Sequence, residues 1–144
     1  METEKKKQAA YAIFRFTFGI NMFLHGATRT GGNAAPFIEH MIKMFENSIM
    51  PEWFVRAFAV AVIPLEIAVG ISLILGLFTF AGGTAGALLM SCFVFGACLL
   101  QNWSLAGAQM VYVIGFFFLL FFQEYDGYGA DTFRRKRKSA PAGR

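Results

Sequence analysis

The amino-acid sequence predicts an all-α integral membrane protein: a four-helix bundle with a short amphipathic helix in the first outer loop. One reason is composition, because 56% of the 144 residues are hydrophobic and 15% are charged, whereas a soluble domain carries about 25% charged residues. A second is that the apolar residues form four long blocks, and a third is that basic residues gather at both ends of the chain. Together these observations indicate that lipid is the solvent for most of the chain.

The four apolar blocks have the length of transmembrane helices. They cover residues 9–28, 54–78, 81–100 and 105–122, and about 18 to 25 residues suffice for a helix to cross a hydrocarbon core of about 30 Å. The first block contains Arg15, Asn21 and His25, so we interpret it as a retained span rather than a cleaved signal peptide. We expect an N-terminal segment at residues 1–8, a membrane domain at 9–126 and a basic tail at 127–144.

Basic residues at both ends of the chain predict its orientation. Lys5, Lys6 and Lys7 precede the first block, residues 134–138 are all Lys or Arg, and the two short loops between the later blocks contain neither. The positive-inside rule then places both termini in the cytoplasm, in the inner membrane of a prokaryote. Basic runs beside spans usually contact anionic lipid, so we expect the lipid bilayer as a partner and no nucleic acid. We expect the tail beyond Asp131 to be disordered.

The first loop is the longest, and its apolar residues recur at helical spacing over residues 37–49. This pattern predicts an amphipathic helix that ends near Pro51 and either lies on the outer surface or caps the bundle. Trp53 and Trp103 are expected at the outer membrane interface. In the third block, Gly82 and Gly86 have the spacing that allows close contact between helices.

A polar stripe follows one face of the first predicted span. Ionisable groups inside a bilayer are costly and usually functional, so we expect this stripe to face the interior of the bundle. At about 100° per residue, an arc of about 120° contains Arg15, Phe18, Asn21, Met22, His25 and Arg29.

Glu66 lies near the middle of the second span, where counting about 1.5 Å per residue places it level with Asn21. We therefore expect an Arg15–Glu66 ion pair, which would offset part of both burial costs. His25 would carry a proton, with Glu66 as its partner. The alternative is that Arg15 and Glu66 only fix the register of the two helices.

Further polar side chains lie near the outer ends of the third and fourth spans. Gln109 and Tyr112 share one face of the fourth span, where they would close a polar cavity around His25 and Glu66. Gln101 belongs to the preceding turn. The alternative role of these groups is hydrogen bonding between helices.

The sequence contains no metal or haem motif. Cys92 and Cys98 are six residues apart, and a helix turns by about 240° over that distance, so the two thiols do not easily pair. No CxxC motif occurs. We interpret both cysteines as small apolar packing residues.

Three segments resemble the DoxX/DoxD family over residues 10–126. The first has Arg15, Gly19, His25-Gly26 and Arg29, and the second has Pro64-Leu65-Glu66 followed by Leu75-Gly76-Leu77-Phe78-Thr79. The third has Gln101-Asn102-Trp103 with Gly107, Gln109 and Tyr112. The sequence departs from the family at Phe80, where members often have Arg.

The resemblance implies a subunit of a quinone-linked oxidoreductase, in some members similar to the small membrane subunit of thiosulfate:quinone oxidoreductase. A quinone would be the cofactor, and a second redox subunit or a homo-oligomer the partner. His25 would contact a quinone carbonyl, Glu66 would exchange its proton and Arg15 would supply the counter-charge. The substrate would be bound by Asn21, Arg29, Gln101, Trp103, Gln109 and Tyr112. The alternatives are a non-enzymatic scaffold or anchor for a redox complex, and a small-molecule transporter.

Overall fold

Helices account for all regular structure in residues 1–139, which are the residues that this computed structural model describes, with no strand among them. In chain order they are α1 (Glu2–Ala27), the 3-10 turn η1 (Gly31–Asn33), α2 (Ala34–Phe45), α3 (Glu52–Leu75), α4 (Thr79–Leu99), α5 (Trp103–Phe121), the 3-10 turn η2 (Gln123–Tyr125) and α6 (Ala130–Ser139). The chain is therefore all-α, as the sequence predicts.

Three of these helices, α3, α4 and α5, are long and apolar enough to cross a membrane. The chain is thus a membrane protein with three candidate spans in its described part. Helix α1 is long enough but is not among the three, because Arg15, Asn21 and His25 lower its hydropathy. A transmembrane bundle of four helices therefore remains a prediction.

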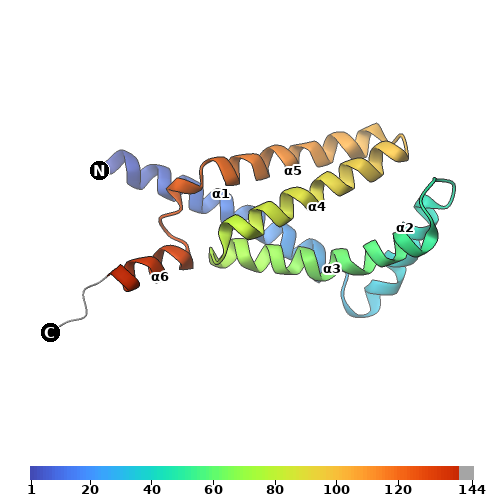
Figure 1. Cartoon of the computed structure of the whole chain (residues 1–144), viewed down its shortest axis with the longest axis horizontal. Helices are drawn as coiled ribbons and strands as arrows, with labels where there is room; N and C mark the ends of the chain where they lie inside the picture. The colour runs from blue at the N-terminus through green and yellow to red at the C-terminus, as the bar shows by residue number, and fades with distance from the viewer. Residues whose placement is uncertain (140–144) are drawn as a thin grey trace.

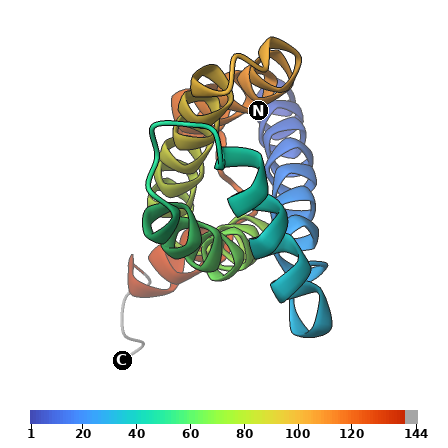
Figure 2. The ribbon, with the colours of Figure 1, turned by 90° about the vertical axis from the view of Figure 1, so that its right-hand side faces the viewer.

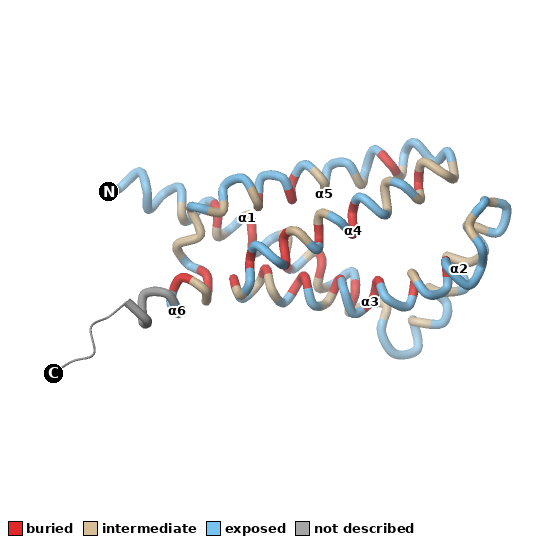
Figure 3. The backbone as a smooth tube through the Cα atoms, in the orientation of Figure 1, coloured by how far each residue is buried: buried red, intermediate tan, exposed pale blue. Residues whose placement is uncertain are grey.

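The long helices lie side by side around a common core (Figures 1 and 2). Helix α1 packs on α3, α3 on α4 and α4 on α5, whereas α1 and α5 meet mainly through side chains such as Phe18 and Phe116. The buried residues lie on the inward turns of these helices (Figure 3), and the largest include Met22, Leu73, Phe116 and Leu119. We call the end crossed by α2 the α2 end, and the opposite end, where α6 lies, the α6 end (Figure 1).

Glycines set the register of the antiparallel α1–α3 pair. A Cβ atom on Gly70 would overlap the backbone of Phe23, and one on Gly26 would lie 2.8 Å from the carbonyl oxygen of Ile63. A Cβ atom on Gly19 would lie 2.7 Å from the backbone nitrogen of Ile74. Because these contacts leave no room for a side chain, they place Glu66 level with Gly26. The predicted level, beside Asn21, is wrong.

The two ends of the chain are more helical than the sequence indicates. Residues 2–8 form the first turns of α1, and Lys6 and Glu2 form an ion pair of 2.8 Å one turn apart. The expected disorder beyond Asp131 is wrong as far as Ser139, because α6 forms there. The Asp131 N–H donates to the Gly76 carbonyl (3.0 Å) and anchors the start of α6. Residues 140–144 of the predicted tail lie outside the described residues.

Helix α2 is the amphipathic helix that the first loop predicts, but it ends at Phe45 and not near Pro51. It packs on α3, and the Phe45 ring lies 3.0 Å from where a Cβ on Gly96 of α4 would stand. Helix α2 therefore caps the bundle, which is the second of the two predicted arrangements (Figure 2). On α4, a Cβ on Gly86 would overlap the Phe116 ring of α5, so the predicted close helix contact is confirmed there.

Candidate functional site

A cavity of about 560 Å³ lies beneath α2, between the α2-end halves of the other long helices. Most of its lining is apolar, and five of the seven methionines of the chain contribute to it: Met22, Met41, Met44, Met50 and Met90. Methionine side chains are flexible and polarisable, so they fit ligands of irregular shape. The volume is within the usual range of about 300–1,000 Å³ for small-molecule sites. We call this space the head cavity.

An ion pair between Arg29 and Glu66 forms the charged part of the head cavity. The Arg29 Nη1 atom donates to Glu66 Oε2 over 2.6 Å. The Glu66 side chain is 2% exposed and the Arg29 side chain 25% exposed. The Arg29 guanidinium also stacks on the Phe37 ring of α2, 4.4 Å from its centroid. Arg29 therefore connects the turn after α1 to both α2 and α3.

The local sequence explains why Arg29 turns back over Glu66. Helix α1 ends at Ala27, and Gly31 follows with a φ of 60°, a left-handed conformation that favours glycine. Asn33 Nδ2 donates to the Thr28 carbonyl over 3.0 Å and closes the turn. The turn thereby holds Arg29 beside α3.

His25 lies one helical turn before Arg29 and also lines the head cavity. Its Nδ1 atom is 3.4 Å from Arg29 Nη2. A guanidinium only donates hydrogen bonds, so this contact fits the His25 tautomer in which Nδ1 accepts and Nε2 carries the ring proton.

Gln109 and Tyr112 bring polar groups to the head cavity from α5. The Gln109 Oε1 atom is buried and has no hydrogen-bond partner among the described residues. Leaving a buried acceptor unpaired costs about 1–3 kcal/mol. A ligand that donates a hydrogen bond to Gln109 would remove that cost.

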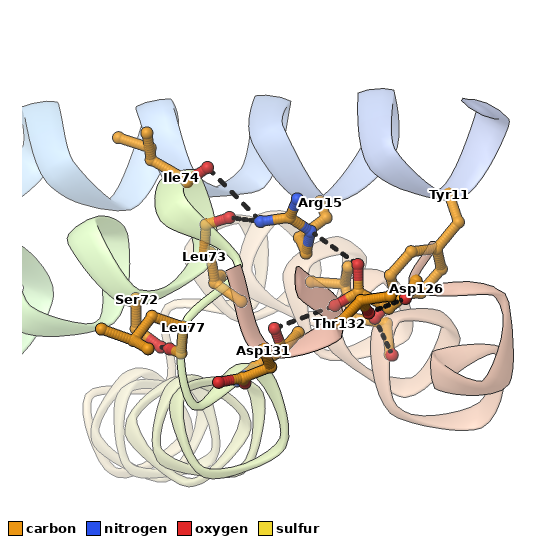
Figure 4. Close-up of polar contacts among 11 residues, drawn as sticks. Tyr11, Arg15, Ser72, Leu73, Ile74, Leu77, Asp126, Asp131 and Thr132 are labelled. Atoms are coloured by element: carbon orange, nitrogen blue, oxygen red, sulfur yellow. Dashed lines mark hydrogen bonds and ion pairs between the residues drawn. The ribbon is translucent and has the colours of Figure 1, made fainter. Parts of the chain in front are cut away.

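The predicted Arg15–Glu66 pair is wrong, because Arg15 lies near the α6 end. Its guanidinium donates to the carbonyl oxygens of Leu73 and Ile74, and its Nε atom is 3.6 Å from Asp126 Oδ1 (Figure 4). With Glu66 level with Gly26, Arg15 is eleven residues away along α1, or about 16 Å. That distance excludes an ion pair between the two side chains.

Asp126 joins Arg15 to a polar network that the sequence did not predict. Its Oδ2 atom accepts from Thr79 Oγ1 over 3.0 Å, and its carbonyl accepts from Thr132 Oγ1 over 2.5 Å. Gly76 has a φ of 63°, and a Cβ there would lie 2.7 Å from the Arg15 guanidinium. The network connects α1, the α3–α4 turn and α6, so we interpret Arg15 as a structural residue and not as part of the head cavity.

Six of the nine predicted site residues line the head cavity: Asn21, His25, Arg29, Glu66, Gln109 and Tyr112. Besides Arg15, two others lie outside it. Gln101 is exposed in the α4–α5 turn with a φ of 53°, and Trp103 is 67% exposed at the start of α5. The head cavity therefore lends no support to their predicted role as substrate-binding residues. Phe37 and Met41 of α2 also line the cavity, and the sequence did not predict them as site residues. Their spacing on an amphipathic helix indicates an apolar face that packs against other residues.

The described residues contain no group of three His, Cys, Asp or Glu side chains that could hold a metal ion. Cys92 and Cys98 are free thiols, and Cys92 lies in the lining of the head cavity.

Comparison with known proteins gives one family. A model of the family described as methylamine utilisation protein MauE matches residues 7–110, more than two thirds of the chain. This is a different membrane family from DoxX/DoxD, so the match overturns the resemblance and, with it, the thiosulfate:quinone assignment. Comparisons with curated proteins and with solved structures give no match.

Proposed function

Because the chain belongs to the MauE family of methylamine utilisation proteins, we propose that it is a membrane-embedded accessory protein of amine utilisation. Its task is to bind a small amphiphilic molecule in the head cavity, and a quinone is the chemical class that the cavity favours. The chain binds and orients this molecule, and a second redox subunit exchanges electrons with it.

The observation that carries this proposal is the unpaired Gln109 Oε1 atom inside an apolar cavity. A quinone has two carbonyl acceptors on an apolar ring, and its reduced form has two hydroxyl donors. The His25 Nε2–H group suits a carbonyl, and the Gln109 amide suits either form. The apolar walls suit the ring and its substituents.

The head cavity is poorly matched to methylamine itself. Methylamine has two heavy atoms, whereas sites with a volume of about 560 Å³ accommodate molecules of drug size. The carboxylate of Glu66, which would attract an ammonium group, is already paired with Arg29. These features favour a larger, uncharged ligand.

In the proposed topology, α1 crosses the membrane together with α3, α4 and α5, and the α6 end faces the cytoplasm. Lys5, Lys6 and Lys7 begin α1 at that end, and the basic residues 134–138 belong to α6. Basic residues beside membrane spans are enriched on the cytoplasmic side, which supports this orientation. The head cavity then lies towards the outer side of an inner membrane.

A non-enzymatic scaffold is the second candidate, and the Arg29–Glu66 pair favours it. Arg29 contacts Phe37 of α2 and Glu66 of α3 from the turn after α1. A pair with a purely structural role would make the same contacts. In that case the head cavity would bind nothing specifically, and ligand binding distinguishes the two functions.

The test is equilibrium binding of a tritiated quinone with one isoprene unit, and of its quinol, to the protein in lipid nanodiscs. Quinone dissolved in protein-free nanodiscs is subtracted. Gln109→Leu should weaken binding of the quinol about tenfold, the value of one buried hydrogen bond. Gln101→Leu changes the same residue type outside the cavity and should leave binding within about twofold of wild type.

Two results would contradict the proposal. The first is wild-type protein that binds no more quinone or quinol than empty nanodiscs. The second is equal binding by the Gln109 and Gln101 variants. Either result would favour the scaffold.

A further inference from the structure

A second cavity, of about 420 Å³, lies at the α6 end between α1 and α5. It is lined by Lys7, Ala10, Tyr11, Phe14, Phe118, Phe122 and Tyr125. We call it the tail cavity.

The walls of the tail cavity are made almost entirely of carbon. The Tyr11 hydroxyl already donates to the Leu119 carbonyl over 2.9 Å. Lys7 Nζ binds Glu4 over 3.1 Å and the Tyr125 hydroxyl over 3.4 Å, so the polar groups satisfy each other. A hydrocarbon chain suits such a site, and a polar head group does not.

Both cavities border the same two helices. The α1 and α5 residues of the head cavity include Asn21 and Gln109, and those of the tail cavity include Phe14 and Phe118. Between the two cavities α1 and α5 meet mainly through side chains, among them Phe18 of α1 and Phe116 of α5. We call this line of side-chain contacts the seam.

Phe18 occupies the seam between the two cavities. Its ring lies 4.8 Å from the Phe14 ring, 5.4 Å from that of Phe116 and 6.2 Å from that of Tyr112, measured between centroids. A Cβ atom on Gly115 would overlap the Phe18 ring, so this glycine provides the notch that holds it. The Phe18 ring, packed with Phe116 and Tyr112, therefore separates the two cavities, and a tail that joins them must displace this ring.

We propose that the tail cavity holds the hydrocarbon tail of the molecule whose head occupies the head cavity. The ligand is then a long-tailed, lipid-soluble quinone, and its tail passes Phe18 along the seam. This inference rests on the proposed function. From His25 to Tyr11 is fourteen residues of α1, or about 21 Å, which requires a tail of several isoprene units.

The tail cavity also opens towards the bilayer. Phe118 and Phe122 are 42% and 38% exposed, and their rings stack 5.9 Å apart at its edge. A tail can therefore enter from the lipid between α1 and α5. Moving a tail from lipid into protein gains little hydrophobic free energy, so the position of the tail is a sharper test than the affinity.

The experiment uses two photoreactive quinones in nanodiscs that contain the full-length protein. One carries an azide on the quinone ring and the other a diazirine at the end of a long isoprenoid tail. Mass spectrometry maps the labelled residues. The ring label should fall on the head cavity, and the tail label on the tail cavity.

Ala10→Phe fills the tail cavity with a side chain, and Ala9→Phe makes the same change at an exposed neighbour outside either cavity. Ala10→Phe should reduce tail labelling of Tyr11 and Phe118 at least about tenfold, with ring labelling unchanged. Ala9→Phe should change neither label. Melting temperatures of both variants confirm that they are folded.

The outcomes separate this inference from the proposed function. Two labelling results would overturn the tail site alone. In the first, the ring label falls on the head cavity and the tail label spreads over the lipid-facing side of α4. In the second, both alanine variants show equal tail labelling. A phospholipid that occupies the tail cavity, seen as a bound mass lost in Ala10→Phe, does the same. Ring label outside the head cavity overturns both proposals.

Discussion

The Arg29–Glu66 pair should respond asymmetrically to removal of its two members. Arg29→Met leaves the Glu66 carboxylate buried with no partner, because Glu66 is 1% exposed and Arg29 makes its only side-chain hydrogen bond within residues 1–139. Removing one partner of a buried pair costs about 3–5 kcal/mol. We expect a loss of about 3 kcal/mol in the free energy of unfolding, at the lower end of this range, because Glu66 borders the head cavity and not a close-packed core.

The reverse substitution should cost less. After Glu66→Gln, Arg29 is still a quarter exposed and can donate to the new amide oxygen. The loss is then that of one charge-assisted hydrogen bond, about 1–2 kcal/mol. The double variant leaves no unpaired charge and should be more stable than Arg29→Met alone, by about 1 kcal/mol or more.

Reversible unfolding by SDS in mixed micelles measures these free energies for wild type, both single variants and the double variant. Of the three variants, Arg29→Met should have the lowest free energy of unfolding and Glu66→Gln the highest, with the double variant between them. Additive effects of the two substitutions, or a Glu66→Gln loss as large as that of Arg29→Met, would refute the reasoning from burial.

Two further predictions concern packing and the α6 end. Gly70→Ala should lower the free energy of unfolding by about 2 kcal/mol through overpacking, because its Cβ overlaps the Phe23 backbone. The control Gly107→Ala has no neighbour within 4 Å and should be neutral or stabilise by up to about 1 kcal/mol. Asp126→Asn should cost about 2 kcal/mol and speed tryptic cleavage in α6, because Arg15 loses its counter-charge. Equal unfolding midpoints for the glycine variants, or unchanged cleavage in Asp126→Asn, would count against these contacts.

The helices were predictable because their signals are local. The apolar blocks overlap α3, α4 and α5, and the spacing over residues 37–49 indicated α2. The polar stripe of α1 also pointed inward as expected at Arg15 and Met22, which are both buried. Each of these signals needs only the chain neighbours of a residue.

Partners in space were harder to predict, because they depend on register between helices. The predicted level of Glu66 assumed that the first two spans begin and end together. The glycine contacts instead let α3 extend beyond Ala27 by about twelve residues, from Pro64 back to Glu52, or about 18 Å. That shift moves Glu66 from Arg15 to Arg29 and creates the space that α2 covers.

Asp126 shows a second limit of sequence reasoning. It follows the last apolar block, in a stretch that has no periodic pattern, and nothing local indicates that it is buried. Only the fold of η2 and α6 brings its carboxylate beside Arg15 and Thr79. The predicted partner of Arg15, Glu66, is therefore wrong, because Arg15 lies beside Asp126 and Glu66 pairs with Arg29.

The most direct test of the central claim is an experimental structure of the protein crystallised from lipid in the presence of saturating quinone. A quinone ring should lie beneath α2, within hydrogen-bond distance of the Gln109 side chain and beside the Arg29–Glu66 pair. A head cavity that contains only lipid chains, or a quinone bound elsewhere on the protein, would contradict it.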